Sequence, residues 1–531
     1  MATKRQTRRE LGTPLLPLAL DHGAARPLQR QLFGQLREII LTGRVSPGAR
    51  LPSTRALARE LGCSRNTVIG AYDQLYAEGY LEGASGSGTY VSSVLPEELL
   101  RSRPYTSAQA SGGVQASGGA RGSVPTSGLS ARGRELSRPQ RTPLRRSEAF
   151  APGLPETAQF PWDVWSRLLA RAWRRPPAGL VHHGEAAGYR PLREAIAAYL
   201  RTTRAVTCDW RQVLITSGGQ QCIDLTVKAL TDPGDPVWIE DPGFPGLRGP
   251  LAAAGVRRVP VPVDDEGFAL DVALTRAPEA RLAIVTPSHQ YPLGTVMSLG
   301  RRLQLLDWAA DSGAYILEDD YDSEYRYSGR PLTALQGLDR AGRVVYAGSF
   351  SKVLFPSLRL GYLVLPEDLA GPVAELRRAI DDHPSAIAQP ALAGFFAEGH
   401  LAAHVRRMRR LYAERQNLLL EAAGVHLGGL LELASDEAGL HLVARLAPAL
   451  ACHASDREVA RAATAHKVTA PALQDFYLGT PDRQGLLLGY AAVPEPEIDA
   501  KVKALAQAIG TIARGDRAGA TSEAFPPLGK N

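Results

Sequence analysis

The sequence predicts an α/β protein of two folded parts, the larger of which is built on a mostly parallel sheet. Three observations support this prediction. The chain has 531 residues, enough for two to four domains of about 100–200 residues each. In the part at 150–514, short apolar runs alternate with stretches of helical periodicity. A segment poor in large apolar residues, 96–149, separates this part from a smaller one at 20–95.

The smaller part carries the pattern of a helix-turn-helix followed by a β-hairpin. Ser53 is a good N-cap for a first helix, which ends near Gly62, and Ser64 is a good N-cap for a second helix. Two short helices joined around a glycine are typical of this motif, in which the second helix can enter the major groove of DNA. The residues 79–81 and 86–91 predict the hairpin, or wing.

This pattern closely resembles the winged helix of the GntR superfamily of bacterial regulators, from Pro27 to Val91. The resemblance implies a double-stranded DNA operator as partner and a set of DNA-contacting residues: Ser53, Arg55, Ser64, Arg65, Asn66, Thr67 and Gly88, with Gly86 as an alternative in the wing. Related regulators often have arginine where this chain has Ile69, which argues against a base contact there. A surface ion pair is the alternative for Arg55, and helix capping is the alternative for the two serines.

The segment 96–149 is rich in Gly, Ser, Pro and Arg, and we expect a flexible linker there. It contains nine arginines, which belong either to a solvated tether or to a segment that also contacts DNA phosphates. The last residues, 515–531, predict a disordered tail.

The larger part contains five apolar runs that we expect to be buried strands: 213–216, 236–240, 282–285, 315–318 and 344–347. Helical spacing from Leu299 to Ala310 lies between two of them. In a parallel α/β sheet the ligand lies beyond the carboxyl ends of the strands, so the loops that follow these runs are candidate sites.

Those loops carry the chemistry that pyridoxal 5′-phosphate needs. Lys352, after the last run, can form a Schiff base with an aldehyde. Asp319 and Asp320, with Tyr321 beside them, follow the fourth run and offer a carboxylate to a pyridine nitrogen. The Ser-Gly-Gly-Gln sequence 217–220 ends the first run and opens a helix, whose N–H groups favour a phosphate.

The set resembles fold-type-I aminotransferases, over about Phe150 to Ala508, in motifs such as His289-Gln290-Tyr291-Pro292. The resemblance implies that Lys352 forms the Schiff base, that Asp319 pairs with the ring nitrogen, and that Tyr321 bonds the 3′-oxygen. Asp320 remains the alternative to Asp319. The phosphate is expected to be held by Gly218, Gly219, Gln220, Ser349 and Arg359, and the ring is expected to stack on Phe244.

A GntR winged helix, a linker and an aminotransferase-like domain together identify the chain as a member of the MocR subfamily. The resemblance implies a transcription regulator whose aminotransferase-like domain senses a small molecule, and a homodimer that is head-to-tail and domain-swapped.

Two departures narrow this interpretation. Leucine in 486–488 stands where aminotransferases place an arginine for the substrate carboxylate, and Phe244 replaces a frequent tyrosine. An apolar wall cannot compensate a carboxylate for lost water, so at most vestigial transaminase activity is expected. This suits a PdxR-type sensor of pyridoxal phosphate for vitamin B6 synthesis, or a sensor of an amine or amino acid.

The charge distribution agrees with this division. The net charge is +7, and residues 1–95 contribute +5, from 12 Lys and Arg against 7 Asp and Glu. No apolar stretch reaches the roughly 18 residues of a membrane span, no signal peptide is evident, and four scattered cysteines predict no disulfide framework or metal site. The sequence therefore predicts a cytoplasmic protein without a membrane partner.

Two alternatives to the regulator remain. One is a catalytically active, pyridoxal phosphate-dependent aminotransferase with an appended DNA-binding module. The other is a DNA-binding protein whose large domain only dimerises.

Overall fold

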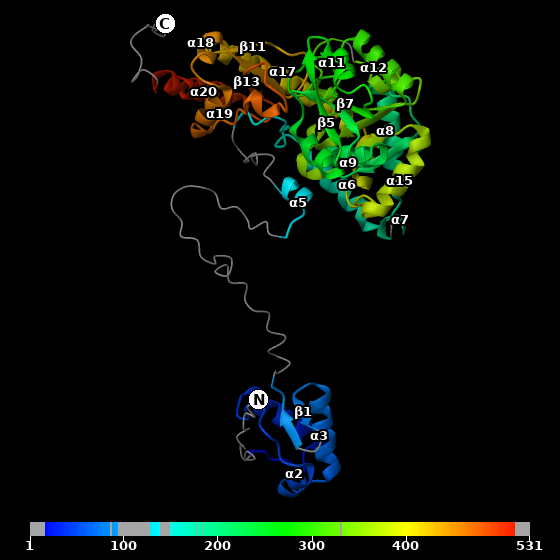
Figure 1. Ribbon diagram of the computed structural model, residues 1–531, viewed down its shortest axis with the longest axis vertical. Coiled ribbons are helices and arrows are strands. Elements are labelled where there is room, and N and C mark those ends of the chain that lie inside the picture. The colour runs from blue at the N-terminus through cyan, green and yellow to red at the C-terminus, as the bar shows by residue number, and fades with distance from the viewer. Residues whose placement is uncertain are drawn as a thin grey trace, which may run out of the picture. The chain divides into compact units, whose positions relative to one another are not determined.

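The computed structural model describes residues 16–84, 88–93, 128–137, 149–176, 178–182, 184–329 and 332–515. The chain divides into two compact units, Met1–Gly122 and Ser123–Asn531 (Figure 1). Gly86, most of the predicted linker and the tail beyond Gly515 lie outside the described residues. Within the described part, no helix is both long and apolar enough to cross a membrane.

The first unit is the winged helix that the sequence predicts. It contains α1 (Leu28–Leu41), α2 (Thr54–Glu60), α3 (Arg65–Ala77) and the antiparallel strands β1 (Leu81–Ala84) and β2 (Gly88–Val91). The Ser53 side chain accepts a hydrogen bond from the backbone of Ala56, and Ser64 accepts one from Thr67, so both serines cap their helices. Leu36, Leu57 and Val68 bring the three helices together in one buried core.

The second unit is built on a mixed, mostly parallel sheet. Among the described residues its strands follow the spatial order β3-β10-β9-β8-β7-β4-β5-β6. Their bounds are β3 (Val213–Thr216), β4 (Pro236–Asp241), β5 (Arg257–Asp264), β6 (Gly267–Phe268), β7 (Leu282–Val285), β8 (Tyr315–Asp320), β9 (Val344–Ser349) and β10 (Gly361–Val364). All five expected strands are confirmed, and β10 runs antiparallel to both of its neighbours, β3 and β9.

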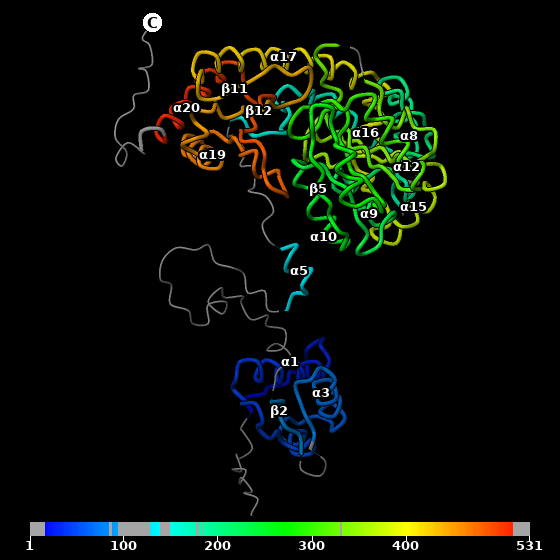
Figure 2. The backbone as a smooth tube through the Cα atoms, turned by 45° about the horizontal axis from the view of Figure 1, so that its top comes forward, coloured from blue at the N-terminus to red at the C-terminus, as the bar shows by residue number. Residues whose placement is uncertain are grey.

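Helices cover both faces of this sheet, because its central strands are apolar on both sides. Val345 packs against α9 (Gly219–Leu230), α10 (Arg248–Ala254) and α15 (Glu367–Asp381). Its neighbour Val344 points to the other face, which α11 (Leu270–Arg276) and α12 (Leu299–Ser312) cover. The other helices of this part of the chain are α6 (Trp162–Arg174), α7 (Ala178–Val181), α8 (Arg190–Thr203), α13 (Leu335–Leu338), α14 (Phe350–Val353) and α16 (Gln389–Ala397) (Figure 2).

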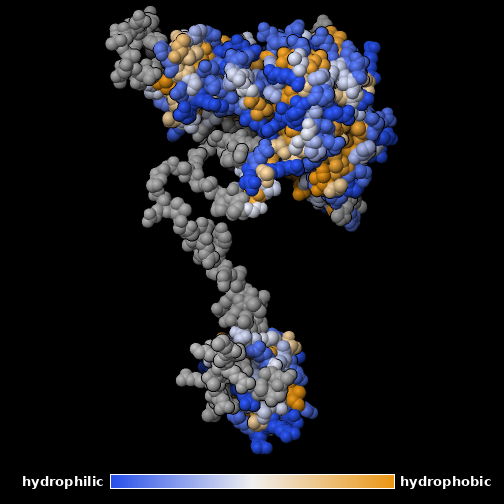
Figure 3. All heavy atoms as spheres, viewed as in Figure 1, coloured by the Kyte–Doolittle hydropathy of each residue, from blue (hydrophilic) through white to orange (hydrophobic). Residues whose placement is uncertain are grey.

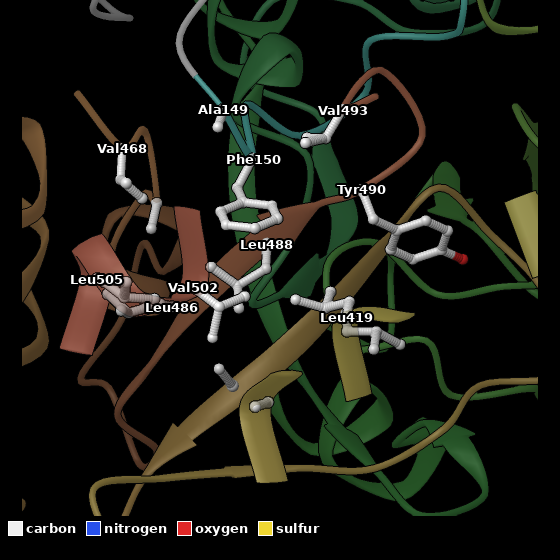
Figure 4. Packing of buried hydrophobic residues seen from close by; sticks show 14 of the residues in the cluster. Ala149, Phe150, Leu419, Val468, Leu486, Leu488, Tyr490, Val493, Val502 and Leu505 are labelled. Carbon is white, nitrogen blue, oxygen red and sulfur yellow. The ribbon is translucent and has the colours of Figure 1, made fainter. Parts of the chain in front are cut away.

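A smaller sheet closes the C-terminal part of this unit. Its antiparallel strands β11 (Leu431–Leu433), β12 (His441–Leu446) and β13 (Gly485–Gly489) pack on α17 (His400–His426), α19 (Asp456–Ala465) and α20 (Glu495–Gly515), and α18 (Pro448–Ala451) follows β12. Figure 4 shows Phe150 over Leu488 in the shared apolar core, with Tyr490 to one side. The segment that enters the large unit is thereby fixed to its C-terminal sheet.

The expected absence of regular structure in the linker is wrong for a short stretch. Residues Ala131–Leu136 form α5, which Ser130 caps through a bond from the backbone N–H of Gly133. Glu135 lies 3.5 Å from Arg258 at the start of β5, so an ion pair joins α5 to the large unit. The cap and the ion pair compensate for the lack of apolar side chains on which the prediction rested.

Candidate functional site

The predicted site loops meet at one edge of the large sheet because of how its strands pair. Gly361, the first residue of β10, lies opposite Thr216 at the end of β3 and opposite Ser349 at the end of β9. Asp320 at the end of β8 lies opposite Gly348. Because β10 runs antiparallel, its start lies at the edge where the other strands end. Arg359, two residues before β10, lies at that edge too.

An anion cradle forms at the start of α9. Gly218 caps this helix with φ 102°, a conformation that favours glycine, and the first-turn N–H groups of an α-helix have no intrahelical acceptor. The guanidinium of Arg359 lies beside Gly218, 3.5 Å from where a Cβ would stand. The Gln220 side chain donates one amide hydrogen to the Gly246 carbonyl at 2.8 Å, which leaves its second amide hydrogen and its backbone N–H for an anion.

Lys352 lies on α14, directly after β9. Ser349 caps this short helix by accepting from the backbone of Ser351. The Lys352 ammonium donates to the carbonyl of Gly153, which has φ 72° and no room for a Cβ beside the amine. The segment that precedes the large sheet therefore positions the lysine.

The two candidate carboxylates face different partners. Asp320 accepts a hydrogen bond from Arg204 at 2.8 Å and another from the Tyr346 hydroxyl at 2.6 Å, and all three side chains are buried. Among the described residues, none donates a side-chain hydrogen bond to Asp319. Burial, together with the nearby charges of Asp320 and Glu240, raises the pKa of Asp319 to about 7. Asp319 is thus the carboxylate with capacity left for a cationic ligand.

Aromatic side chains complete the site. The ring of Phe244, just before α10, meets that of Tyr291 edge-on, and Tyr291 meets Tyr321 in the same way. The Tyr321 hydroxyl lies 2.9 Å from Nδ1 of His289. Phe244, Tyr291 and Tyr321 therefore come together, and Tyr321 stands two positions after Asp319.

The wall that replaces the expected arginine is apolar. Leu486, Leu487 and Leu488 on β13 are fully buried. Leu486 and Leu488 point into the C-terminal core, whereas Leu487 packs with Phe476 in a cluster that Tyr291 touches. The described side chains of these three leucines offer no charge to a carboxylate.

The residues of this edge fit pyridoxal 5′-phosphate. They supply an amine in Lys352, a half-buried carboxyl in Asp319 that receives no side-chain hydrogen bond from the described residues, and a glycine-lined cradle with one guanidinium. An aldehyde, a protonated ring nitrogen and a phosphate are the matching groups of that cofactor.

In the N-terminal unit, the candidate DNA residues lie on the exposed start of α3 and on α2. Arg55, Arg65 and Asn66 are exposed, and Arg55 forms no ion pair within the described residues. Thr67 bonds the Ser64 hydroxyl at 2.9 Å, so these two side chains serve the helix cap first. Gly88 begins β2 with φ 123° and packs on Arg50.

Sequence reasoning gave no role to His289 or Gly153 and did not single out Asp436. His289 belongs to the motif His289-Gln290-Tyr291-Pro292, and that motif is the signal that could have indicated it. Asp436 contacts His289 across 147 residues, a pairing without a local sequence signal.

Comparison with known proteins gives the family. Residues 28–91 match the gntR family of bacterial regulatory proteins, and residues 182–505 match aminotransferase class I and II. The probable rhizopine catabolism regulatory protein MocR of Rhizobium meliloti is 42% identical over 90% of this chain and 92% of its own length. The pyridoxine biosynthesis transcriptional regulator PdxR of Corynebacterium glutamicum is 32% identical over 90% of this chain and 95% of its own length.

Solved structures agree for the large unit. The α-aminoadipate aminotransferase LysN of Thermus thermophilus, complexed with N-(5′-phosphopyridoxyl)-L-leucine, is 27% identical with a TM-score of 0.63 and covers 69% of this chain and 92% of its own. Together with the matches to both domains, these similarities show that the chain belongs to the MocR-type transcription regulators, which join a gntR-family DNA-binding domain to an aminotransferase-like domain.

Proposed function

We propose that this chain regulates transcription by binding operator DNA through its N-terminal unit and pyridoxal phosphate through its large unit. The observation that carries the proposal is the convergence of Lys352, Asp319 and the Gly218–Arg359 cradle on one sheet edge of a chain that also has a winged helix. We also propose that the protein is cytoplasmic, because its DNA partner lies in that compartment.

Pyridoxal phosphate, when bound, supplies an aldehyde that reacts with amines. Lys352 would hold that group covalently, and Asp319 would accept the hydrogen bond of the ring nitrogen. Gly218, Gly219, Gln220, Ser349 and Arg359 would bind the phosphate, Phe244 would stack on the ring, and Tyr321 would bond its 3′-oxygen. The proximity of Phe244 to Tyr291 supports a stacked ring at this place.

A sensor is favoured over an enzyme because of the apolar wall on β13. A carboxylate placed against Leu487 would lose water without gaining a partner. The effector is therefore pyridoxal phosphate itself, or an amine that reacts with it, and the similarity to PdxR supports the first.

Steady turnover separates the sensor from the aminotransferase. We expect cofactor-loaded protein to convert amino donors and keto acceptors at no more than a trace rate. Spectrophotometric assays across a panel of amino acids test this, and a turnover number of the usual enzyme range, about 1–10³ per second, would contradict the proposal.

The DNA-binding unit makes a separate prediction. Arg65→Ala is expected to weaken operator binding by about 1–3 kcal/mol if Arg65 reads a guanine edge. A loss that is equal on operator and unrelated DNA would make Arg65 a phosphate contact. Titration of labelled operator measures both cases, and Arg37→Ala, on α1, serves as the control because Arg37 donates to Tyr80 within its own unit.

We also propose a homodimer. Figure 3 shows apolar residues gathered on the large unit over the region of α6 and α15. The exposed apolar side chains of this unit include Ile380 on α15, Val181 on α7 and Ile387. Such a patch is typical of a protein interface. Sedimentation of the full chain tests the proposal, and a monomer at micromolar concentration would contradict it.

A further inference from the structure

A buried histidine lies behind the site, and the proposed function gives it no role. His289 follows β7, and its side chain is 1% exposed. Its Nδ1 lies 3.0 Å from Asp322 and 2.9 Å from the Tyr321 hydroxyl, and its Nε2 lies 3.2 Å from Asp436. The imidazole is thus held between two carboxylates and one phenol.

The backbone is built around this ring. Gly294 and Gly439 both have positive φ, and a Cβ at either would collide with His289 or with its partner Asp436. A larger residue at either position would displace the ring. The position of His289 is therefore fixed by both the large sheet and the C-terminal sheet.

The geometry requires a proton on each ring nitrogen. An ionised carboxylate only accepts hydrogen bonds, so Nδ1 must donate to Asp322 and Nε2 to Asp436. Burial disfavours the charged ring, but the charge of Asp322 and the two hydrogen bonds outweigh it and raise the pKa of His289 to about 10. Burial and this charge lower the pKa of the adjacent His441 to about 4, so His441 stays neutral.

This protonation fixes the direction of the phenol. An imidazolium has no acceptor, so Tyr321 cannot donate its proton to His289. Toward Nδ1 the Tyr321 oxygen can only accept, sharing the single Nδ1–H with Asp322. Burial and the charge of Asp322 raise the pKa of Tyr321 well above its usual range, so the proton stays on the oxygen. The O–H of Tyr321 is then left to donate to a group other than His289.

We propose that His289 is a positioning residue that makes Tyr321 a hydrogen-bond donor to the bound cofactor and ties that donor to the C-terminal sheet through Asp436. The inference rests on the proposed function. Asp436 lies between β11 and β12, and its backbone N–H donates to the side chain of Gln416 on α17. Asp436 is thereby held by the C-terminal part of the unit. A shift of the C-terminal sheet would therefore release His289 and with it the donor at the cofactor.

A double-mutant cycle tests the role of His289. His289→Gln offers Tyr321 an amide oxygen, to which the phenol can turn its proton, and Tyr321→Phe removes the donor outright. We expect each variant to raise the dissociation constant of pyridoxal phosphate about tenfold, the worth of one hydrogen bond, and the double variant to equal Tyr321→Phe. The apparent pKa in the pH titration of the bound cofactor's absorbance should shift by the same amount in His289→Gln, in Tyr321→Phe and in the double variant.

The control is His426→Gln, since His426 forms a His–Asp pair with Asp499 near the surface. It should bind cofactor as the wild type does, and the melting temperature of each cofactor-free variant shows whether it is folded. Where His289→Gln does not fold, Asp436→Asn in the same cycle takes its place. Additive losses, or an unshifted titration, would overturn the role of His289. Wild-type protein that takes up no cofactor would instead overturn the proposed function.

Discussion

Replacing Lys352 with alanine is expected to abolish the visible absorbance of the pyridoxal phosphate-loaded protein while leaving the chain folded. Lys352 lies on α14, directly after β9, and its amine donates a hydrogen bond to the backbone carbonyl of Gly153. The loss of that bond costs about 1.5–3 kcal/mol, less than the stability of a typical folded protein. Absorbance spectra and melting temperatures of both proteins measure the two effects.

Borohydride reduction followed by peptide mass analysis identifies the attachment point. The cofactor mass should appear on the peptide that contains Lys352 and on no other. Lys228→Ala is the matched control, because Lys228 forms a surface ion pair with Asp224 on α9. Cofactor attached at another lysine, or colour retained in Lys352→Ala, would contradict the assignment.

The neighbours Asp319 and Asp320 are expected to respond in opposite ways to the same substitution. Asp320→Asn leaves the buried Arg204 without its carboxylate, and breaking a buried ion pair costs about 3–5 kcal/mol. Asp319→Asn leaves the Asp320–Arg204 pair intact and should weaken cofactor binding instead. Urea unfolding of the cofactor-free proteins and titration with pyridoxal phosphate separate the two effects. Equal losses of stability would contradict the division of roles.

The stability difference between Asp319→Asn and wild type should also depend on pH. The folded-state pKa of Asp319 is raised to about 7, so above its unfolded pKa the unfolded chain releases a proton that the folded chain retains. This destabilises the cofactor-free wild type progressively between about pH 4 and 7. Asp319→Asn lacks this penalty, so its free energy of unfolding should rise relative to that of the wild type over that pH range. Urea midpoints at several pH values measure the trend.

The sequence predicted what depends on local pattern. Buried strands such as 213–216 and 344–347 are short apolar runs, and the residues that follow them must meet at one sheet edge if the strands are parallel. The helix caps of the N-terminal unit are equally local, because Ser53 and Ser64 bond residues three positions away. The sequence alone therefore predicted that these strand-end residues lie at one edge of the sheet.

What the sequence could not show depends on distant partners. The choice between Asp319 and Asp320 is set by Arg204, which lies 116 residues from Asp320, and by Tyr346 on the neighbouring strand. The pairing of His289 with Asp436 crosses from one sheet to another. The helix α5 was missed because a capping serine and one ion pair, rather than an apolar face, hold it.

The central claim is that the state of the cofactor site governs the binding of DNA, and operator binding with and without pyridoxal phosphate tests it most directly. The DNA upstream of the protein's own gene is the first operator to try, with wild type and Lys352→Ala in parallel. We predict that pyridoxal phosphate changes the affinity or footprint of the wild type, by about 5- to 150-fold in affinity for a coupling of ordinary size, and that Lys352→Ala responds less. Identical affinity and footprint of the cofactor-loaded and cofactor-free wild type would contradict the account.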